Sequence, residues 1–109
     1  MKHGEVRWYR FTAPDKKRPV LILTRDSAIG HLGEITVAPI TSTVRGIPSE
    51  VFLAQEDGMP QECAINLDHL QTVSKGRIGP LLTTLQTKKM SEVRGALLFA
   101  LQFRTPPGH

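Results

Sequence analysis

The sequence has little that could cross-link the chain or anchor it in a membrane. Cys63 is the only cysteine among the 109 residues, which excludes a disulfide within the chain and a zinc site built from cysteine pairs. The apolar stretches at residues 20–23 and 96–101 are far shorter than the roughly 20 residues that a membrane-spanning helix needs. Residues 1–5 do not begin a signal peptide. We therefore expect a cytoplasmic protein without membrane contact, in which Cys63 is a small buried side chain rather than a reactive thiol.

Motifs typical of nucleotide and metal enzymes are also missing. The sequence contains no P-loop, no dinucleotide-binding fingerprint and no His-Glu-x-x-His pattern. The histidines His3, His31, His69 and His109 stand isolated from one another. We expect no metal site and no cofactor, and we interpret most of these histidines as surface residues. His69 stays a candidate because it follows Asp68 at a junction between two predicted strands.

The sequence contains enough apolar residues for one small core. Hydrophobic residues make up 39% of the chain and charged residues 22%, which is typical of a soluble globular domain and excludes a disordered polymer. A chain of this length suits one domain. We expect that domain to span residues 1–103, followed by a flexible tail at 104–109 that lacks apolar anchors.

Short β-prone segments follow one another closely along the chain. They lie at residues 4–11, 18–24, 34–41, 49–54, 62–67 and 69–73. Loops rich in glycine, proline or charge separate them, and residues 27–33 form one such loop. From Thr87 the spacing changes, because Met90, Val93 and Leu97 recur at helical intervals. The pattern predicts a mainly β (α+β) fold, a small barrel of about six strands with a C-terminal amphipathic helix.

Positive charge is concentrated near the N-terminus. Up to Arg18 the chain has six basic residues against two acidic ones, and the remainder has eight of each, so this segment accounts for the formal net charge of +4. Charge gathered on one loop is what a phosphate-bearing partner requires, although a solvated basic edge has the same pattern. Arg18 stands between that loop and a buried strand. It either ends the loop or holds its guanidinium in a cleft as a bidentate phosphate donor.

Three further polar residues stand where predicted strands end. Thr41 and Ser42 follow an apolar strand, where hydroxyl groups contact a ligand or, more commonly, cap their own backbone. Asp68 lies between two strands and is either a turn former or an acid/base group. The residues alone leave both interpretations of each position open.

Four segments of the sequence resemble MazF/PemK-type toxins and occur in the same order. They are GEVRW at 4–8, RPVLIL at 18–23, TVAPITS at 36–42, and NLD at 66–68 leading into QTV at 71–73. The resemblance spans residues 4–103 and includes the terminal helix. It implies an SH3-like, CcdB/PemK-like barrel that forms a homodimer. It also implies a metal-independent, sequence-specific endoribonuclease, the toxin of a type II toxin-antitoxin system, whose partners are single-stranded RNA and an acidic antitoxin.

The resemblance also implies roles for individual residues. Arg18 and Thr41 match the principal catalytic pair, and Asp68 matches a carboxylate that acts in catalysis or substrate contact. Ser42 matches an RNA-contacting position. In this family a ribose 2′-hydroxyl attacks the adjacent phosphate, which leaves a 2′,3′-cyclic phosphate and a 5′-hydroxyl. Arginine stays protonated in proteins, so we assign Arg18 to phosphate stabilisation, with proton donation as a further candidate role. Asp68 and His69 are left as alternative general bases.

The remaining RNA contacts are expected from side-chain chemistry. Lys16 and Lys17 would follow the phosphates, His69 would contact the strand, and Asn66 and Gln71 could read base edges, which are accessible only in unpaired RNA. Asn66 and Gln71 stand where other members of the family have arginines, so the recognised RNA sequence does not transfer.

Two rival functions share this type of barrel. One is a gyrase-binding toxin like CcdB, whose activity resides in an aromatic-Gly-Ile C-terminus, whereas this chain ends Pro107-Gly108-His109. The other is an RNA-binding barrel without catalysis. Because one fold can serve all three functions, the barrel by itself does not distinguish them.

Overall fold

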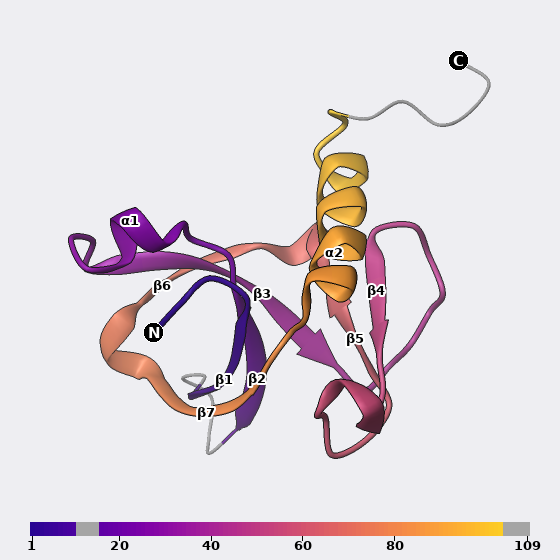
Figure 1. Cartoon of the computed structure of the whole chain (residues 1–109), viewed down its shortest axis with the longest axis horizontal. Coiled ribbons are helices and arrows are strands. Elements are labelled where there is room, and N and C mark those ends of the chain that lie inside the picture. The colour runs from indigo at the N-terminus through magenta and orange to yellow at the C-terminus, as the bar shows by residue number, and fades with distance from the viewer. Residues whose placement is uncertain (11–15, 104–109) are drawn as a thin grey trace.

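The computed structural model describes residues 1–10 and 16–103. Its strands are β1 (Glu5–Arg10), β2 (Lys17–Ile22), β3 (Glu34–Thr41), β4 (Glu50–Leu53), β5 (Cys63–Asn66), β6 (Gln71–Ser74) and β7 (Ile78–Thr84). Its helices are α1 (Asp26–Ile29) and α2 (Thr87–Ala100), with short 3-10 turns η1 (Gln55–Asp57), η2 (Leu67–His69) and η3 (Lys75–Arg77). Figure 1 shows α2 standing beside β4 and β5. The sequence predicts a loop at 12–17, of which residues 12–15 lie outside the described residues and Lys17 begins β2 instead. The expected tail at 104–109 also lies outside the described residues.

The strands form a bent antiparallel sheet in the order β4-β5-β3-β2-β1-β7, with β6 paired to β3 off this path. The strand β3 is long enough to pair with β6 through Glu34–Val37 and with β5 through Ile40 and Thr41. Among the described residues these pairings do not close into a ring, so the fold is barrel-like and open. The prediction of a mainly β fold with a C-terminal helix is confirmed.

Two elements differ from the sequence-based expectation. The described residues contain seven strands instead of about six, because β7 pairs with β1. Gly79 and Pro80 argue against a strand in the sequence, but β7 is last in the strand order, and an edge strand tolerates a proline that cannot donate to a further neighbour. The second difference is α1, which occupies part of the expected loop at 27–33.

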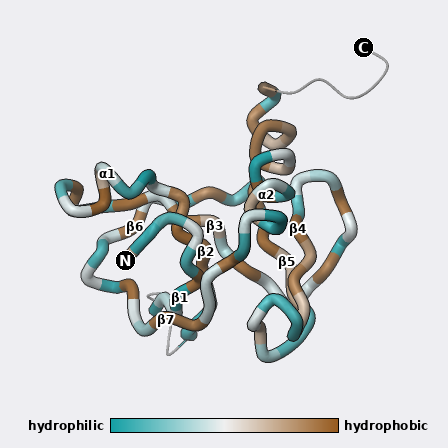
Figure 2. The backbone as a smooth tube through the Cα atoms, in the orientation of Figure 1, coloured by the Kyte–Doolittle hydropathy of each residue, from teal (hydrophilic) through white to brown (hydrophobic). Residues whose placement is uncertain are grey.

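Alternate residues of the central strands fill two separate cores. Val20 and Ile22 belong to one core and Leu21 to the other, because successive side chains of a strand point to opposite faces. The helix α2 covers the second core through buried Val93 and Ala96. Figure 2 shows the hydrophobic stretches of β2 and β3 in the middle of the molecule. This arrangement confirms a strand buried on both faces at residues 20–22, whereas Leu23 follows the end of β2 and is half-buried.

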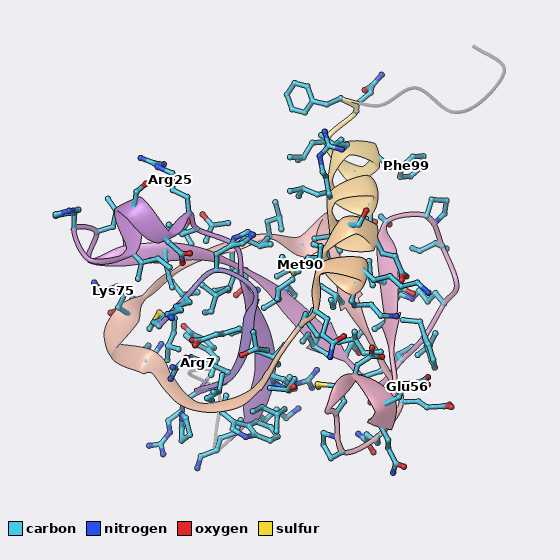
Figure 3. All side chains as sticks on the ribbon, in the orientation of Figure 1. Arg7, Arg25, Glu56, Lys75, Met90 and Phe99 are labelled. Carbon is cyan, nitrogen blue, oxygen red and sulfur yellow. The ribbon has the colours of Figure 1, made fainter. Side chains whose placement is uncertain are left out.

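A small polar cluster joins the N-terminal strand to β7. Arg7 Nε donates to Glu5 Oε1 at 2.8 Å, and Arg7 Nη1 donates to the carbonyl oxygen of Gly79 at 3.1 Å. The backbone N–H of Lys2 also donates to Glu5 Oε1, at 2.9 Å. Burial alone would raise the pKa of Glu5, but these bonds and the nearby positive charges hold the pKa below its ordinary value. Figure 3 labels Arg7 where β1 and β7 run side by side.

The described helices are short relative to a lipid bilayer. Within residues 1–10 and 16–103, none is both long enough and apolar enough to span a membrane. Three exposed apolar side chains, Phe99, Leu101 and Phe103, follow one another at the C-terminal end of α2. Figure 3 shows Phe99 projecting away from α2.

Candidate functional site

Arg18 and Thr41 come together because β2 begins where β3 ends. The two strands are antiparallel, with Val20 paired to Pro39 and Leu21 to Ala38. This pairing ends at Val20 and Pro39, and Arg18 and Thr41 each lie two residues beyond it on the same side. Both residues line two neighbouring cavities, so they form part of the wall between them.

The larger cavity, called here the polar cavity, has a volume of about 440 Å³ and collects residues from β2, β3, β5, η2 and β6. It is lined by Lys16, Arg18, Pro39, Ile40, Thr41, Thr43, Arg45, Glu50, Asn66, His69 and Gln71. Six of the nine residues predicted from the sequence therefore lie around one hollow. Its cationic and amide side chains are donors suited to an anionic ligand with polar edges.

The smaller cavity, called here the Trp8 cavity, lies on the other side of the Arg18–Thr41 wall and has a volume of about 310 Å³. It is lined by Trp8, Lys17, Arg18, Pro19, Ile40, Thr41, Ser42, Met59, Pro60, Gln61 and Cys63. The predicted residues Lys17 and Ser42 are found here and not in the polar cavity. Six of the other lining side chains are apolar, namely Trp8, Pro19, Ile40, Met59, Pro60 and Cys63, and the lining also includes the polar groups of Arg18, Thr41 and Gln61.

The Thr41 hydroxyl has a structural bond as well as access to both cavities. The backbone N–H of Thr43 donates to Thr41 Oγ1 at 3.1 Å. The capping role considered for this position is therefore present. Because the hydroxyl acts as acceptor in that bond, its hydrogen can still be donated to a ligand.

Asp68 is the one predicted site residue that lines neither cavity. Ser49 Oγ donates to Asp68 Oδ2 at 2.5 Å, and the Asp68 backbone N–H donates to Asn66 Oδ1 at 3.0 Å. The second bond occupies the carbonyl oxygen of Asn66 and leaves its amide NH₂ for a ligand in the polar cavity. Asp68 itself therefore lies outside both cavities, whereas its hydrogen-bond partner Asn66 and its neighbour His69 line the polar cavity.

Sequence reasoning missed three polar residues of the polar cavity, namely Thr43, Arg45 and Glu50. Glu50 Oε1 accepts hydrogen bonds from the backbone N–H groups of Arg45 at 2.9 Å and Gly46 at 3.2 Å. This carboxylate therefore holds the loop between β3 and β4 against the cavity. A basic residue beside a glycine in a predicted loop is a usable sequence signal for Arg45, but the role of Glu50 depends on the folded loop.

Cys63 lies at the Trp8 cavity and is buried. Burial raises the pKa of the Cys63 thiol, and the negative charge of Asp57 raises it further. The thiol is therefore kept in its neutral, poorly nucleophilic form. The prediction that Cys63 is a small buried side chain is confirmed.

Candidate metal ligands do not gather in the described part of the chain. Within residues 1–10 and 16–103 there is no group of three or more histidine, cysteine or acidic side chains that could hold a metal ion. The groups that the two cavities present are guanidinium, ammonium, amide, hydroxyl and imidazole groups, together with the Glu50 carboxylate.

Known proteins match this chain over most of its length. A family model described as PemK-like, MazF-like toxin of type II toxin-antitoxin system matches residues 2–101. The probable endoribonuclease MazF5 of Mycobacterium tuberculosis (strain ATCC 25618 / H37Rv) is 39% identical over 99 residues, which cover 90% of each protein. The Mycobacterium tuberculosis toxin MazF-mt6 has a TM-score of 0.82 at 34% identity, covering 90% of this chain and 96% of the toxin.

A further structural match includes an antitoxin in its description. A chain of the MazE-MazF crystal structure from Deinococcus radiodurans has a TM-score of 0.80 at 27% identity, covering 94% of this chain and 96% of that one. Together with the family model, which runs from before β1 into the last turn of α2, this match confirms the resemblance carried by the four sequence segments. The chain therefore belongs to the PemK-like, MazF-like toxins of type II toxin-antitoxin systems.

Proposed function

We propose that this chain is an endoribonuclease that cuts single-stranded RNA at the wall between the polar cavity and the Trp8 cavity. The observation that carries the proposal is the placement of Arg18 and Thr41, which line both cavities. A phosphate on that wall would have one nucleotide on each side. The names of relatives such as MazF5, a probable endoribonuclease, support the activity.

The chemistry is a transfer of the phosphate within the RNA. The 2′-hydroxyl of the upstream ribose attacks phosphorus, the bond from phosphorus to the departing 5′-oxygen breaks, and a 2′,3′-cyclic phosphate and a 5′-hydroxyl result. Arg18 stabilises the negative charge that builds on the phosphorane, because its guanidinium is a permanent bidentate donor. The Thr41 hydroxyl adds a donor to the same oxygens. The departing oxygen takes its proton from solvent.

The geometry favours His69 over Asp68 as general base. His69 lines the polar cavity, whereas Asp68 lines neither cavity and accepts a hydrogen bond from Ser49. A neutral imidazole nitrogen can accept the proton of the 2′-hydroxyl. We assign Asp68 a positioning role, because its backbone N–H orients the Asn66 amide and its carboxylate anchors η2 to Ser49.

The other cavity residues would hold the RNA strand. Lys16 and Lys17 are exposed beside the two cavities and would follow the phosphates. Ser42 would contact the strand from the Trp8 cavity, and Asn66 and Gln71 would read base edges from the polar cavity. Such readout requires unpaired bases, and in-line attack requires a backbone free to distort, so the substrate is single-stranded.

The proposed function also implies two protein partners, an antitoxin and a second copy of this chain. An acidic antitoxin segment would compete with RNA for the basic residues at the cavities, as the MazE-MazF assembly of a structural neighbour suggests. RNA and such an antitoxin are met in the cytoplasm, where we place the protein. We also propose a homodimer, since a small barrel gains stability by burying exposed apolar side chains against a second copy.

The decisive experiment incubates the pure protein with a long single-stranded RNA in EDTA. We expect cuts whose downstream fragments carry 5′-hydroxyl ends, shown by direct labelling with polynucleotide kinase. Arg18→Ala should lower the rate about 100-fold, because losing one preorganised donor costs roughly 3 kcal/mol. Arg25→Ala is the matched control, since exposed Arg25 lines neither cavity and belongs to the α1 region (Figure 3).

Three outcomes would contradict the proposal. Cleavage that disappears in EDTA and returns with a divalent cation would exclude this mechanism. A folded Arg18→Ala protein with near-normal turnover would remove Arg18 from the site. Binding of RNA without any cleavage would favour a non-catalytic RNA-binding barrel, and inhibition of gyrase without cleavage would favour a CcdB-like toxin.

A further inference from the structure

We propose that the Trp8 cavity is the base-binding subsite for the nucleotide immediately downstream of the cut, and that Trp8 and Gln61 set which base is accepted there. The inference rests on the proposed ribonuclease function. It assigns the Trp8 cavity to one nucleotide and gives that nucleotide a position relative to the broken bond.

The walls of the Trp8 cavity fit an unpaired base. Its inner side is apolar, with Ile40, Met59 and Cys63 buried, while Trp8 is half-buried. Apart from half-buried Thr41, the polar side chains stand at exposed positions, among them Gln61. A nucleobase has two apolar faces and a polar edge, so stacking on an aromatic ring and hydrogen bonding at the rim satisfy it at the same time. The Gln61 amide supplies both a donor and an acceptor for that edge.

The pairing of β1 with β7 is irregular at Trp8. In the pairing of β1 with β7, Arg7 lies opposite Leu81 and Tyr9 lies opposite Ile78. Trp8 alone therefore faces two residues of β7, which is the pattern of a β-bulge. The extra residue lies on β7, so the bulge bends β7 where it passes Trp8, and bulges are common beside active sites.

The bulge is supported on both sides of Trp8. On one side, a Cβ added to Gly79 would lie 3.3 Å from the carbonyl oxygen of Trp8, a tighter contact than most Cβ atoms make, so β7 passes close to the Trp8 backbone here. On the other side Trp8 pairs with Pro19, one residue after Arg18. The start of β2 therefore positions both Trp8, through its pairing with Pro19, and the phosphate donor Arg18.

The position of His69 decides which nucleotide occupies which cavity. The general base must reach the 2′-hydroxyl of the upstream ribose, and His69 lines the polar cavity but not the Trp8 cavity. The upstream nucleotide therefore lies in the polar cavity. The phosphate sits at the shared wall of Arg18 and Thr41, so the downstream nucleotide extends into the Trp8 cavity.

Two exposed glutamines provide a matched pair of variants. Gln61 lines the Trp8 cavity and Gln71 lines the polar cavity. After the wild-type cut sites have been read by sequencing, kcat/KM is measured on oligonucleotides that vary one base on either side of the cut. We expect Gln61→Ala to change the preference only at the downstream base and Gln71→Ala only at the upstream base. Gln86→Ala, outside both cavities, should change neither.

Trp8 is the only tryptophan in the chain, so its fluorescence reports directly on the subsite. The probe is an oligonucleotide with a 2′-deoxy sugar upstream of the cut, which removes the nucleophile. We expect this RNA to quench Trp8, and we expect quenching to be lost and affinity to fall about tenfold when the downstream nucleotide is abasic. Trp8→Phe should keep the downstream preference, whereas Trp8→Leu should relax it and lower kcat/KM about tenfold or more.

The outcomes separate this inference from the function on which it rests. If the wild-type protein cuts no RNA, the proposed function fails and the assignment of sides fails with it. If it cuts RNA but Gln61→Ala and Trp8→Leu leave the downstream preference unchanged, only the base subsite is overturned. If these variants change the upstream preference instead, the two cavities have been assigned in the wrong order. Quenching by an acidic peptide but not by RNA would mark an antitoxin site and would also overturn the proposal.

Discussion

The Ser49 hydroxyl donates to the Asp68 carboxylate at 2.5 Å, and this bond ties the start of β4 to η2. Ser49 is buried, and its carbonyl oxygen also accepts a hydrogen bond from the backbone N–H of Leu67 at 2.9 Å. Two hydrogen bonds with Ser49 thus hold the turn beside Asn66 and His69, and Ser49 itself does not line the polar cavity. This relationship separates the residue that positions the site from the residues that line it.

Because His69 lines the cavity while Ser49 and Asp68 only hold the turn, we expect variants of these residues to differ in their kinetics. His69→Gln should lower kcat about 100-fold, because removing a general base typically costs 10²–10⁴ in rate. Ser49→Ala should produce a smaller loss and leave the shape of the pH–rate profile unchanged. Asp68→Asn should resemble Ser49→Ala. Single-turnover cleavage measured across pH checks these expectations, and a flattened pH profile in Asp68→Asn alone would make Asp68 the base instead.

The basic residues at the cavities predict salt-dependent competition between RNA and antitoxin. Replacing both Lys16 and Lys17 by alanine should weaken binding of a non-cleavable RNA and reduce the slope of log Kd against log salt by about 1.4, since each phosphate contact on single strands contributes roughly 0.7. Lys2→Ala with Lys88→Ala is the charge-matched control away from the cavities. Filter binding at salt concentrations from about 50 to about 200 mM measures the slope, because affinity from phosphate contacts falls steeply over this range.

The same assay tests how inhibition works. A peptide from the acidic antitoxin tail should displace RNA from the wild-type protein, and added salt should weaken this displacement. Simultaneous binding of peptide and RNA without loss of affinity would exclude direct occlusion of the cavities.

Two glycines with positive φ predict unequal losses of stability. Gly46 has φ of 68°, and a Cβ added there would meet only open space, so Gly46→Ala should cost about 1–2 kcal/mol from backbone strain alone. Gly58 has φ of 93°, and a Cβ there would overlap the Thr83 side chain. Because Thr83 Oγ1 donates to the Asp57 carbonyl oxygen, its displacement adds about 1–3 kcal/mol. Urea unfolding compares the two, and equal losses would contradict the packing of Gly58 against β7.

The lowered pKa of Glu5 predicts a pH-dependent contribution to stability. A carboxyl group whose pKa is lower in the folded state binds fewer protons there than in the unfolded chain, so stability rises with pH. The contribution is present above about pH 4.3, the ordinary pKa of a glutamate, and is lost as pH falls through the lowered pKa of the folded state. Glu5→Gln should remove this dependence. Thermal unfolding between about pH 3 and 7 checks it, and parallel curves for the two proteins would contradict it.

The exposed apolar end of α2 predicts a surface for self-association. Light scattering should give twice the mass of one chain at micromolar concentration. Phe103, with 78% of its surface exposed, follows exposed Phe99 and Leu101, and Phe103→Ser should shift the dimer toward monomer because it removes apolar area from the interface. A monomer in the wild type would exclude the dimer, and an unchanged mass in the variant at all concentrations would place the interface elsewhere.

Local patterns in the sequence were sufficient for most of the elements. The helix α2 follows from apolar spacing after Thr87, and β2 follows from the apolar run after Pro19, because each signal lies within one segment. The strand β7 was missed since Gly79 and Pro80 are permitted there only by its place at the edge of the sheet. That place depends on pairing with β1, far away in the chain.

Some residues of the candidate site could likewise be predicted from the sequence, and others could not. The sequence by itself, through the resemblance of its four segments, pointed to the family and to Arg18 and Thr41, since these residues lie within the motifs. Only the tertiary structure separated Asp68 from the cavity that His69 lines and brought Glu50 and Trp8 to the site. These placements depend on antiparallel pairing, on a bulge between β1 and β7, and on a hydrogen bond from Ser49 across 19 residues. Contacts between residues distant in sequence leave no local pattern, so the folded chain alone decides which side chains share a cavity.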